Sequence, residues 1–227
     1  MTDGSRRERI VAVVPVRSLR NGKTRLATVL DEQGRETLLR QTAAGVVVAA
    51  RHSGVVATVL VVSQDAEVLT WAATLESDVI PVIQPTDLPG LNGAIEAGRE
   101  WALHDGATAI LSLFADLPFL SPADIRGLIA RPEPVVLGPD RRDEGTNALL
   151  LRLAGNGVAF RFAFGEDSLQ RHRDEARRLG LDTGIYRAPG VAFDLDTPGD
   201  WTDYLATLPN LAAGVEPTLA PCGVGIA

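Results

Sequence analysis

Residues 10–26 read IVAVVPVRSLRNGKTRL, and the rest of the chain can be organised around this stretch. Ile10 to Val16 are apolar and mostly β-branched, which predicts a strand buried on both faces, as in a covered parallel sheet. The chain then breaks into a short loop rich in arginine and lysine. A buried strand that ends in cations and backbone N–H groups is suited to hold a phosphate. A core strand followed by a solvated turn would look the same, so residues further along must decide between the two.

Apolar runs and helical patterns alternate along the rest of the chain. Further strands are predicted at residues 55–62, 78–83, 108–114, 134–137, 147–153 and 191–195. Helices are predicted at residues 24–51, 65–75, 92–104 and 167–179, after Ser121 and after Thr197. The expected helix caps are Asp31, Asp65, Ser121 and Thr197. The alternation predicts one α/β domain at residues 10–208 with a mostly parallel sheet, after a flexible N-terminus at 1–9 and before an Ala/Gly/Pro-rich tail at 209–227.

The bulk composition excludes several classes of protein. The 227 residues are 45% hydrophobic and 22% charged, as in a globular protein, with a net charge of -7. An acidic chain has no overall basic field to attract nucleic acid, although a local basic pocket can still bind a small anion. The single cysteine, Cys222, rules out a disulfide framework and favours a reducing cytoplasm. We see no signal peptide and no stretch long enough for a transmembrane helix, and a homodimer is one assembly that the sequence leaves open.

Two familiar nucleotide-binding motifs do not fit the first loop. Gly22-Lys23-Thr24 resembles the end of a Walker A motif, but Arg17 stands where that motif requires a second glycine. No G-x-G-x-x-G sequence follows the first strand, which argues against a dinucleotide-dependent dehydrogenase. The sequence also shows no serine elbow and no zinc-binding histidine pair. If the cations of the loop bind a phosphate, they therefore do so in another kind of site.

Carboxylates follow two of the other predicted strands. In open α/β sheets, ligands bind at the carboxyl ends of the strands, so these acids should meet the basic loop there. Asp116 comes just after the strand at 108–114, and Asp194 and Asp196 lie at the end of the strand at 191–195. Residues two apart in a regular strand point the same way. Each acid could instead cap a turn or the last helix, but carboxylates combined with substrate phosphates are typical ligands of Mg²⁺, and we favour a metal site.

Two polar segments later in the chain could bind a second anion. Residues 145–147 (Gly-Thr-Asn) lie in a loop, while Gly165 and Ser168 sit at the start of a predicted helix, where backbone N–H groups suit an anion. From these residues alone, an ordinary turn and a helix cap explain both segments better. The Arg-His-Arg run at 171–173 either forms a solvated helix face or lines that anion site.

Six segments in a defined order carry a resemblance to known proteins. They are VPVRSLRNGKTRLA, LPGLNGAI, FADLPFL, GPDRRDEGTNALL, FRFAFGEDSLQRH and FDLDTPGDW, and they span nearly the whole chain. Together they resemble the guanylyltransferases of coenzyme F-420 biosynthesis. The resemblance implies a Rossmann-like nucleotidyltransferase fold of the nucleotide-diphospho-sugar transferase type, a single domain with a mostly parallel mixed sheet. It also implies that GTP is coupled to a small phosphorylated three-carbon acid, with release of pyrophosphate.

Roles can be assigned to individual residues; the resemblance implies those of Lys23, the Mg²⁺ ligands and the acid-binding residues, and our hypothesis for the reaction adds the others. The catalytic cations would be Lys23, Arg17 and Arg25. The nucleotide would be bound by Pro15, Lys23 and Asn92. The acid substrate would be bound by Thr146, Gly165 and Ser168, and Mg²⁺ by Asp116, Asp194 and Asp196. Position 17 departs from the family pattern, because many relatives carry lysine there and arginine changes the hydrogen-bond geometry.

The acceptor and several other functions remain open at this point. The family's bacterial members use phosphoenolpyruvate and its archaeal members are described with (2S)-2-phospho-L-lactate. The Ala/Arg-rich composition is typical of a bacterial protein and so favours phosphoenolpyruvate. Another nucleotidyltransferase of the same fold would act on a sugar phosphate or a molybdenum-cofactor precursor, but a G-G-x-x-x-R-M-G-like loop is missing. A regulator would bind GTP without turning it over. A metal-dependent glycosyltransferase would use the DLD sequence for its metal and a UDP- or GDP-sugar as donor.

Overall fold

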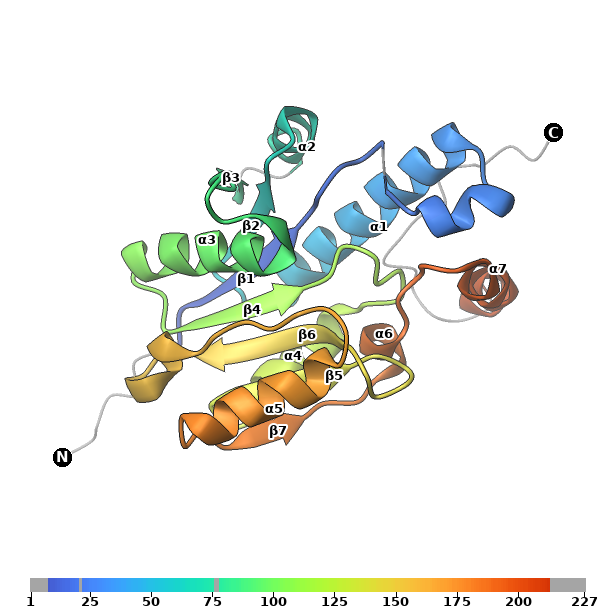
Figure 1. Cartoon of the computed structure of the whole chain (residues 1–227). Helices are drawn as coiled ribbons and strands as arrows, with labels where there is room; N and C mark the ends of the chain where they lie inside the picture. The colour runs from blue at the N-terminus through green and yellow to red at the C-terminus, as the bar shows by residue number, and fades with distance from the viewer. Residues whose placement is uncertain (1–7, 21, 76–77, 213–227) are drawn as a thin grey trace.

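A seven-stranded sheet forms the centre of the molecule, with strand order β3-β2-β1-β4-β6-β5-β7 (Figure 1). The computed structural model describes residues 8–20, 22–75 and 78–212. The strands are β1 (Ile10–Pro15), β2 (Thr58–Ser63), β3 (Val79–Ile83), β4 (Ala109–Leu113), β5 (Val135–Pro139), β6 (Thr146–Arg152) and β7 (Thr183–Ile185). Every neighbouring pair is parallel except the two pairs that β6 makes with β4 and β5. The predicted α/β fold with a mostly parallel, mixed sheet is confirmed.

Helices cover both faces of the sheet. Because side chains alternate along a strand, Ala12 and Val14 of β1 pack on one face while Val11 and Val13 pack on the other. The first face is covered by α1 (Glu32–His52), α2 (Ala66–Ala72), α4 (Pro122–Ile129) and α6 (Pro189–Ala192). The second face is covered by α3 (Gly90–His104) and α5 (Ser168–Arg178). This two-sided cover explains why the central strands are apolar along their whole length.

The direction of β6 places its first residue at the carboxyl edge of the sheet. The parallel strands β1 and β4 end there at Pro15 and Leu113. Since β6 runs the opposite way, it begins at this edge, and Ala148 pairs with Leu113. Thr146 therefore starts β6 close to where β4 ends. The start of an antiparallel strand and the ends of parallel strands are brought to one edge of the sheet in this way.

The predicted helix caps are present. Asp31 accepts a hydrogen bond from the Gly34 N–H at 2.7 Å, and Asp65 accepts one from the Glu67 N–H at 2.9 Å. Ser121 forms a capping box with Asp124. The first predicted helix divides into a 3-10 helix, η1 (Thr24–Thr28), and α1. The second strand begins at Thr58 rather than at residue 55.

The predicted strand at residues 191–195 is wrong. Pro189 starts a single helical turn, α6, which continues to Ala192, and the chain then runs extended without joining the sheet. A proline at the first helical position has its φ angle preset for this turn. The strand that pairs with β5 is instead β7, only three residues long, which the sequence did not reveal because Thr183–Ile185 lacks an apolar run.

The last described helix, α7 (Pro198–Ala212), lies beside η1. Thr197 and Asp200 cap it reciprocally: Thr197 Oγ1 accepts from the Asp200 N–H at 3.3 Å, and Asp200 accepts from the Thr197 N–H at 2.7 Å. The helix continues past residue 208, where we expected the tail to begin; residues 1–7 and 213–227, which include Cys222, lie outside the described ranges. Among the residues that the structure describes, no helix combines the length and apolar character that a membrane crossing requires.

Candidate active site

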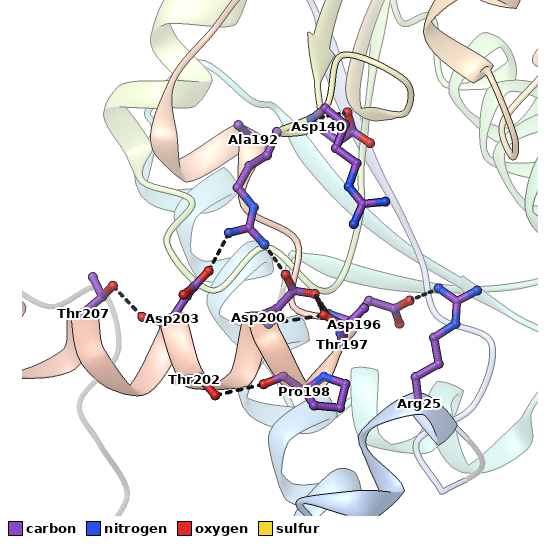
Figure 2. A network of polar contacts seen from close by, with 12 residues as sticks. Arg25, Asp140, Ala192, Asp196, Thr197, Pro198, Asp200, Thr202, Asp203 and Thr207 are labelled. Carbon is purple, nitrogen blue, oxygen red and sulfur yellow. Dashed lines mark hydrogen bonds and ion pairs between the residues drawn. The ribbon is translucent and has the colours of Figure 1, made fainter.

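Lys23 lies between two of the predicted carboxylates. Its Nζ is 2.5 Å from Asp116 Oδ2 and 3.6 Å from Asp196 Oδ1. Arg25 reaches the other oxygen of Asp196 at 2.7 Å (Figure 2). The Lys23 side chain is only 6% exposed whereas that of Arg25 is 72% exposed, so the lysine is the desolvated cation of the pair. The basic loop after β1 and the acids after β4 and α6 therefore meet at the carboxyl edge, as predicted.

Backbone and apolar contacts hold these segments together. The Leu195 N–H donates to the carbonyl oxygen of Asp116 at 3.0 Å, which ties the two acidic segments side by side although neither is a strand at that point. Leu26 of η1 packs with Phe193 and Leu195 in a small separate core. Lys23 precedes η1 in the left-handed conformation, with φ 55°, which is uncommon for a residue with a side chain. These contacts therefore hold the loop that carries Lys23 and Arg25 next to Asp116 and Asp196, with which the two cations form ion pairs.

The carboxylates retain capacity for a divalent cation. Asp116 Oδ1 is buried and has no hydrogen-bond partner among the described residues. Burial raises the pKa of Asp194, and the neighbouring charge of Asp116 raises it further. No group of three His, Cys, Asp or Glu residues in the described ranges is placed to hold a metal alone, and Asp196 is engaged by Lys23 and Arg25. Two carboxylates suffice for Mg²⁺ when phosphates and water complete its shell, so Asp116 and Asp194 fit this ion.

A cavity of about 210 Å³ opens beside these groups. Charged residues and one threonine line it: Arg25, Asp140, Arg141, Arg142, Glu144, Asp194, Asp196, Thr197 and Asp200. Arg141 pairs with Asp200 and Asp203, and its guanidinium lies 4.4 Å from the centre of the Phe193 ring. Burial works against ionisation of Asp200, but hydrogen bonds from Thr197 keep its pKa below the ordinary value. Figure 2 shows Asp196 on the segment leading into α7, and Asp200 and Asp203 on α7 itself. The cavity is suited to a charged ligand.

The three residues predicted to bind the acid substrate lie together on a neighbouring part of the edge. The Thr146 N–H donates to Ser168 Oγ at 2.9 Å, which joins the start of β6 to the start of α5. Thr146 Oγ1 is 3.1 Å from Nδ1 of His172. Thr146 is 1% exposed, Ser168 2% and His172 0%, so His172 does not belong to a solvated helix face. Arg171 on the same helix is exposed.

The turn before α5 is the accessible part of this region. Gly165 is exposed and has a φ angle of +122°, a conformation that residues with a side chain rarely adopt. The backbone N–H groups of Gly165, Glu166 and Asp167 have no hydrogen-bond partner among the described residues. Consecutive free N–H groups beside a helix start attract an anion. The turn can therefore act together with Thr146 and Ser168.

Three other predicted residues have different surroundings. Pro15 ends β1 and is half-buried at the edge. Arg17 is exposed and makes no ion pair with the residues that the structure describes. Asn92 Nδ2 donates to the Phe164 carbonyl at 3.2 Å, and Asn92 Oδ1 accepts from the Phe164 N–H at 2.8 Å. Asn92 thus links the start of α3 to the turn before α5.

Some residues of the site were not predicted from the sequence. Arg141 and Asp200 come together across a long sequence separation, and only the pairing of loop and helix reveals them. Asn147 Nδ2 donates to the Val191 carbonyl at 3.0 Å and so holds α6, which leads to Asp194. Asn147 belongs to the 145–147 segment considered for an anion, but its role in holding α6 was not predicted.

Comparisons with known proteins identify the family of the chain. The family described as "Guanylyl transferase CofC like" matches residues 10–207. A phosphoenolpyruvate guanylyltransferase of Rubrobacter xylanophilus is 44% identical over 194 residues, covering 84% of this chain and 91% of its own. One of Sphaerobacter thermophilus is 40% identical over 208 residues, with coverages of 91% and 97%. A 3-phospho-D-glycerate guanylyltransferase of Phenylobacterium zucineum is 32% identical, with coverages of 93% and 91%.

Solved structures share the fold. A Desulfovibrio desulfuricans protein, described as a candidate nucleotide-diphospho-sugar transferase, superposes with a TM-score of 0.75 at 17% identity, covering 93% of this chain and 92% of its own. A Mycobacterium tuberculosis protein crystallised as a manganese complex has a TM-score of 0.56 at 16% identity, with coverages of 88% and 99%. The predicted nucleotide-diphospho-sugar transferase type of fold is confirmed. Since the family match covers nearly the whole described domain, the chain belongs to the CofC-like guanylyltransferases, a family of nucleotidyltransferases.

Proposed function

We propose that the protein transfers the guanylyl group of GTP to phosphoenolpyruvate and releases pyrophosphate. The observation that carries the proposal is the meeting of Lys23 and Arg25 with Asp116, Asp194 and Asp196 at the carboxyl edge of the sheet. Cations neutralise a triphosphate, and carboxylates hold the divalent ion that accompanies it. The names of the relatives with 44% and 40% identity supply the acceptor.

The reaction needs positioning and charge stabilisation rather than a protein nucleophile. A phosphate oxygen of the acceptor attacks the α-phosphorus of GTP, a new P–O bond forms, and the bond from the α-phosphorus to the bridging oxygen breaks. That oxygen leaves with pyrophosphate, on which negative charge accumulates. The attacking phosphate is already ionised at neutral pH, so no general base is required. Lys23, Arg25 and Arg17 would stabilise the triphosphate and the departing pyrophosphate.

Lys23 is suited to this role because its present partners can be exchanged. Its ammonium is desolvated between Asp116 and Asp196, so its charge is screened less than that of an exposed lysine. When phosphates enter, Lys23 can turn to them and leave the carboxylates to a cation. Asp116 and Asp194 would hold Mg²⁺, with Asp196 as the third predicted ligand. When bound, Mg²⁺ would neutralise part of the phosphate charge.

The other residues with proposed binding roles lie along the same edge of the sheet. Pro15, Lys23 and Asn92 would contact the nucleotide, with Asn92 keeping its bonds to Phe164. Thr146, Ser168 and the turn at Gly165 would bind the phosphorylated acid. We expect the reaction to take place in the cytoplasm, and a homodimer stays a prediction.

A second acceptor is favoured by one observation. The relative from Phenylobacterium zucineum is named for 3-phospho-D-glycerate and is similar over 93% of this chain. (2S)-2-phospho-L-lactate is a third acid of the same class. All three combine a carboxylate with a phosphate, and the basic and N–H groups of the site suit each of them.

The decisive experiment offers GTP with each of the three acids and identifies the product by mass while pyrophosphate is measured. We expect turnover with phosphoenolpyruvate and Mg²⁺, and none with ATP, CTP or UTP. Tight GTP binding without release of pyrophosphate from GTP in the presence of any of the acids would indicate a regulator. Consumption of a UDP- or GDP-sugar in place of GTP would indicate a glycosyltransferase. Either result would overturn the proposal.

A further inference from the structure

We propose that His172 is a positioning residue for the acceptor half of the site, and that it acts by turning the Thr146 hydroxyl into a hydrogen-bond donor. This inference rests on the proposed function, because it assumes that Thr146, Gly165 and Ser168 receive the acid substrate. His172 lies on α5, fully buried, and reaches β6 on one side and the segment before the turn on the other.

The contacts of the ring determine where its proton lies. The Ala163 N–H points at Nε2 of His172 at 3.0 Å, and a backbone N–H can only donate. Nε2 must therefore be the unprotonated, accepting nitrogen. Burial lowers the pKa of His172 to about 4, so the ring is neutral at pH 7 and carries its one proton on Nδ1. That proton points to Thr146 Oγ1, 3.1 Å away.

The consequence falls on Thr146. Its oxygen accepts from Nδ1–H, so its own hydroxyl proton is not used by His172. Ser168 Oγ likewise accepts, from the Thr146 N–H, and keeps its hydroxyl proton. Two hydroxyl protons are thereby left to donate next to the free N–H groups of the turn. An anionic acid is bound by donors, and hydrogen bonds to a charged group are stronger than those between neutral groups.

Packing prevents the ring from turning over. The His172 ring meets the Phe164 ring edge-on, with centroids 4.6 Å apart, and the Phe160 ring lies 5.9 Å away. Phe164 is in turn held by Asn92. A flipped ring would place a carbon or the wrong nitrogen against Ala163 and Thr146. The imidazole thus sets both the shape of the turn and the polarity of the Thr146 hydroxyl.

Two substitutions separate these two contacts. In His172→Gln, the side-chain oxygen can still accept from Ala163 but nothing donates to Thr146. In His172→Asn, the amide can donate to Thr146 while the Ala163 N–H loses its acceptor. We expect the KM for the acid to rise about three- to tenfold in His172→Gln, from the loss of one hydrogen bond, with less change in His172→Asn. The KM for GTP should not change in either. Equal acid KM values in both variants and the wild type would overturn the proposal.

A double-mutant cycle tests whether His172 acts through the hydroxyl. Thr146→Val removes that hydroxyl with little change of shape. If the proposal holds, adding His172→Gln to Thr146→Val raises the acid KM no further; additive effects would overturn it. Leu128→Ala on α4, which packs on the opposite face of the sheet, is the control for lost stability and should leave the acid KM unchanged.

A spectroscopic measurement keeps the inference separate from the proposed function. The chain has three histidines, so ¹⁵N-labelled histidine gives few NMR signals, and His172→Gln identifies the one that matters. We expect a neutral ring protonated on Nδ1 at pH 7. A ring protonated on Nε2, or a charged ring, would overturn the inference whatever the enzyme does. Absence of turnover in the wild type would instead refute the proposed function while leaving the tautomer result intact.

Discussion

The two halves of the site are built from opposite kinds of interaction. In the half formed by Lys23, Arg25 and the three aspartates, the closest contacts are ion pairs, Asp194 accepts a hydrogen bond from the Asn147 side chain, and Arg25 and Asp196 are partly open to water. In the half formed by Thr146, Ser168 and His172, the polar contacts are hydrogen bonds between neutral groups, and the three side chains are buried. The first half can exchange its partners when ligands arrive, whereas the second is fixed in advance.

This difference matches what each ligand requires. A triphosphate and its cation bring several charges, so their site needs charged side chains of both signs. Before the ligands bind, these side chains neutralise one another, as Lys23 does with Asp116 and Asp196. A small acid brings fewer groups, so discrimination depends on where a few donors lie. Substitutions in the charged half should therefore reduce kcat. Substitutions in the neutral half should alter the binding of the acceptor and the stability of the protein at low pH.

The largest expected effect is that of Asp116→Asn. This substitution keeps the shape of the side chain but removes the charge that faces Lys23 and the oxygen that is free for a cation. We expect kcat to fall about 10³-fold, with the protein still folded. Pyrophosphate release measures the rate, and circular dichroism checks the fold. The control is Asp105→Asn, which removes a partner of Arg9 away from the site. A rate near that of the wild type would show that Asp116 has no role with a cation.

Lys23 should come next, and its backbone allows a sharper test. We expect both Lys23→Met and Lys23→Gly to lower kcat about 10²-fold, because both remove the ammonium. Glycine also suits the φ angle of 55° and should make the protein more stable than methionine does, by about 1 kcal/mol. Arg20→Met is the matched control, since Arg20 lies on the same loop but pairs with Glu67. If Lys23→Gly kept its activity, the loop backbone rather than the ammonium would be the functional part.

His172 should make the neutral half sensitive to acid. Burial lowers its pKa from 6.5 to about 4, so between these values the unfolded chain binds a proton that the folded protein does not. Its contribution to stability is present above about pH 6.5 and is lost as the pH falls to about 4, an effect on the order of 3 kcal/mol. Urea denaturation at pH 7 and pH 4.5 measures it. His172→Gln should lose less stability between these pH values than the wild type; an equal loss would assign acid sensitivity to other groups.

The sequence predicted the charged half better than the neutral one, for physical reasons. Lys23 and Asp116 follow apolar strands, and the carboxyl ends of parallel strands share one edge, so their meeting could be inferred. Asp194 and Asp196 reached this edge by a different route, since a proline-started turn replaced the predicted strand and one hydrogen bond to Asp116 took the place of a ladder. His172 lies in a run of charged residues, and only the packing of α5 shows that it is buried.

The smallest expected effect is that of Asp194. Its contribution to stability changes with pH in the opposite direction to that of His172. Burial and the charge of Asp116 raise its pKa, so the folded protein binds this proton more tightly than the unfolded chain does. The resulting stability is fully present below the unfolded value of about 3.8 and is lost as the pH rises through the folded pKa. At pH 7 the ionised carboxylate therefore costs stability in the ligand-free protein, and Asp194→Asn should raise the urea midpoint slightly. GTP with Mg²⁺ should stabilise the wild type more than the variant, because a cation removes that cost. If Asp194→Asn were less stable than the wild type at pH 7 without ligand, the hydrogen bond from Asn147 to the carboxylate would outweigh the cost of burying the charge, and the charged half would not be held ready for a cation.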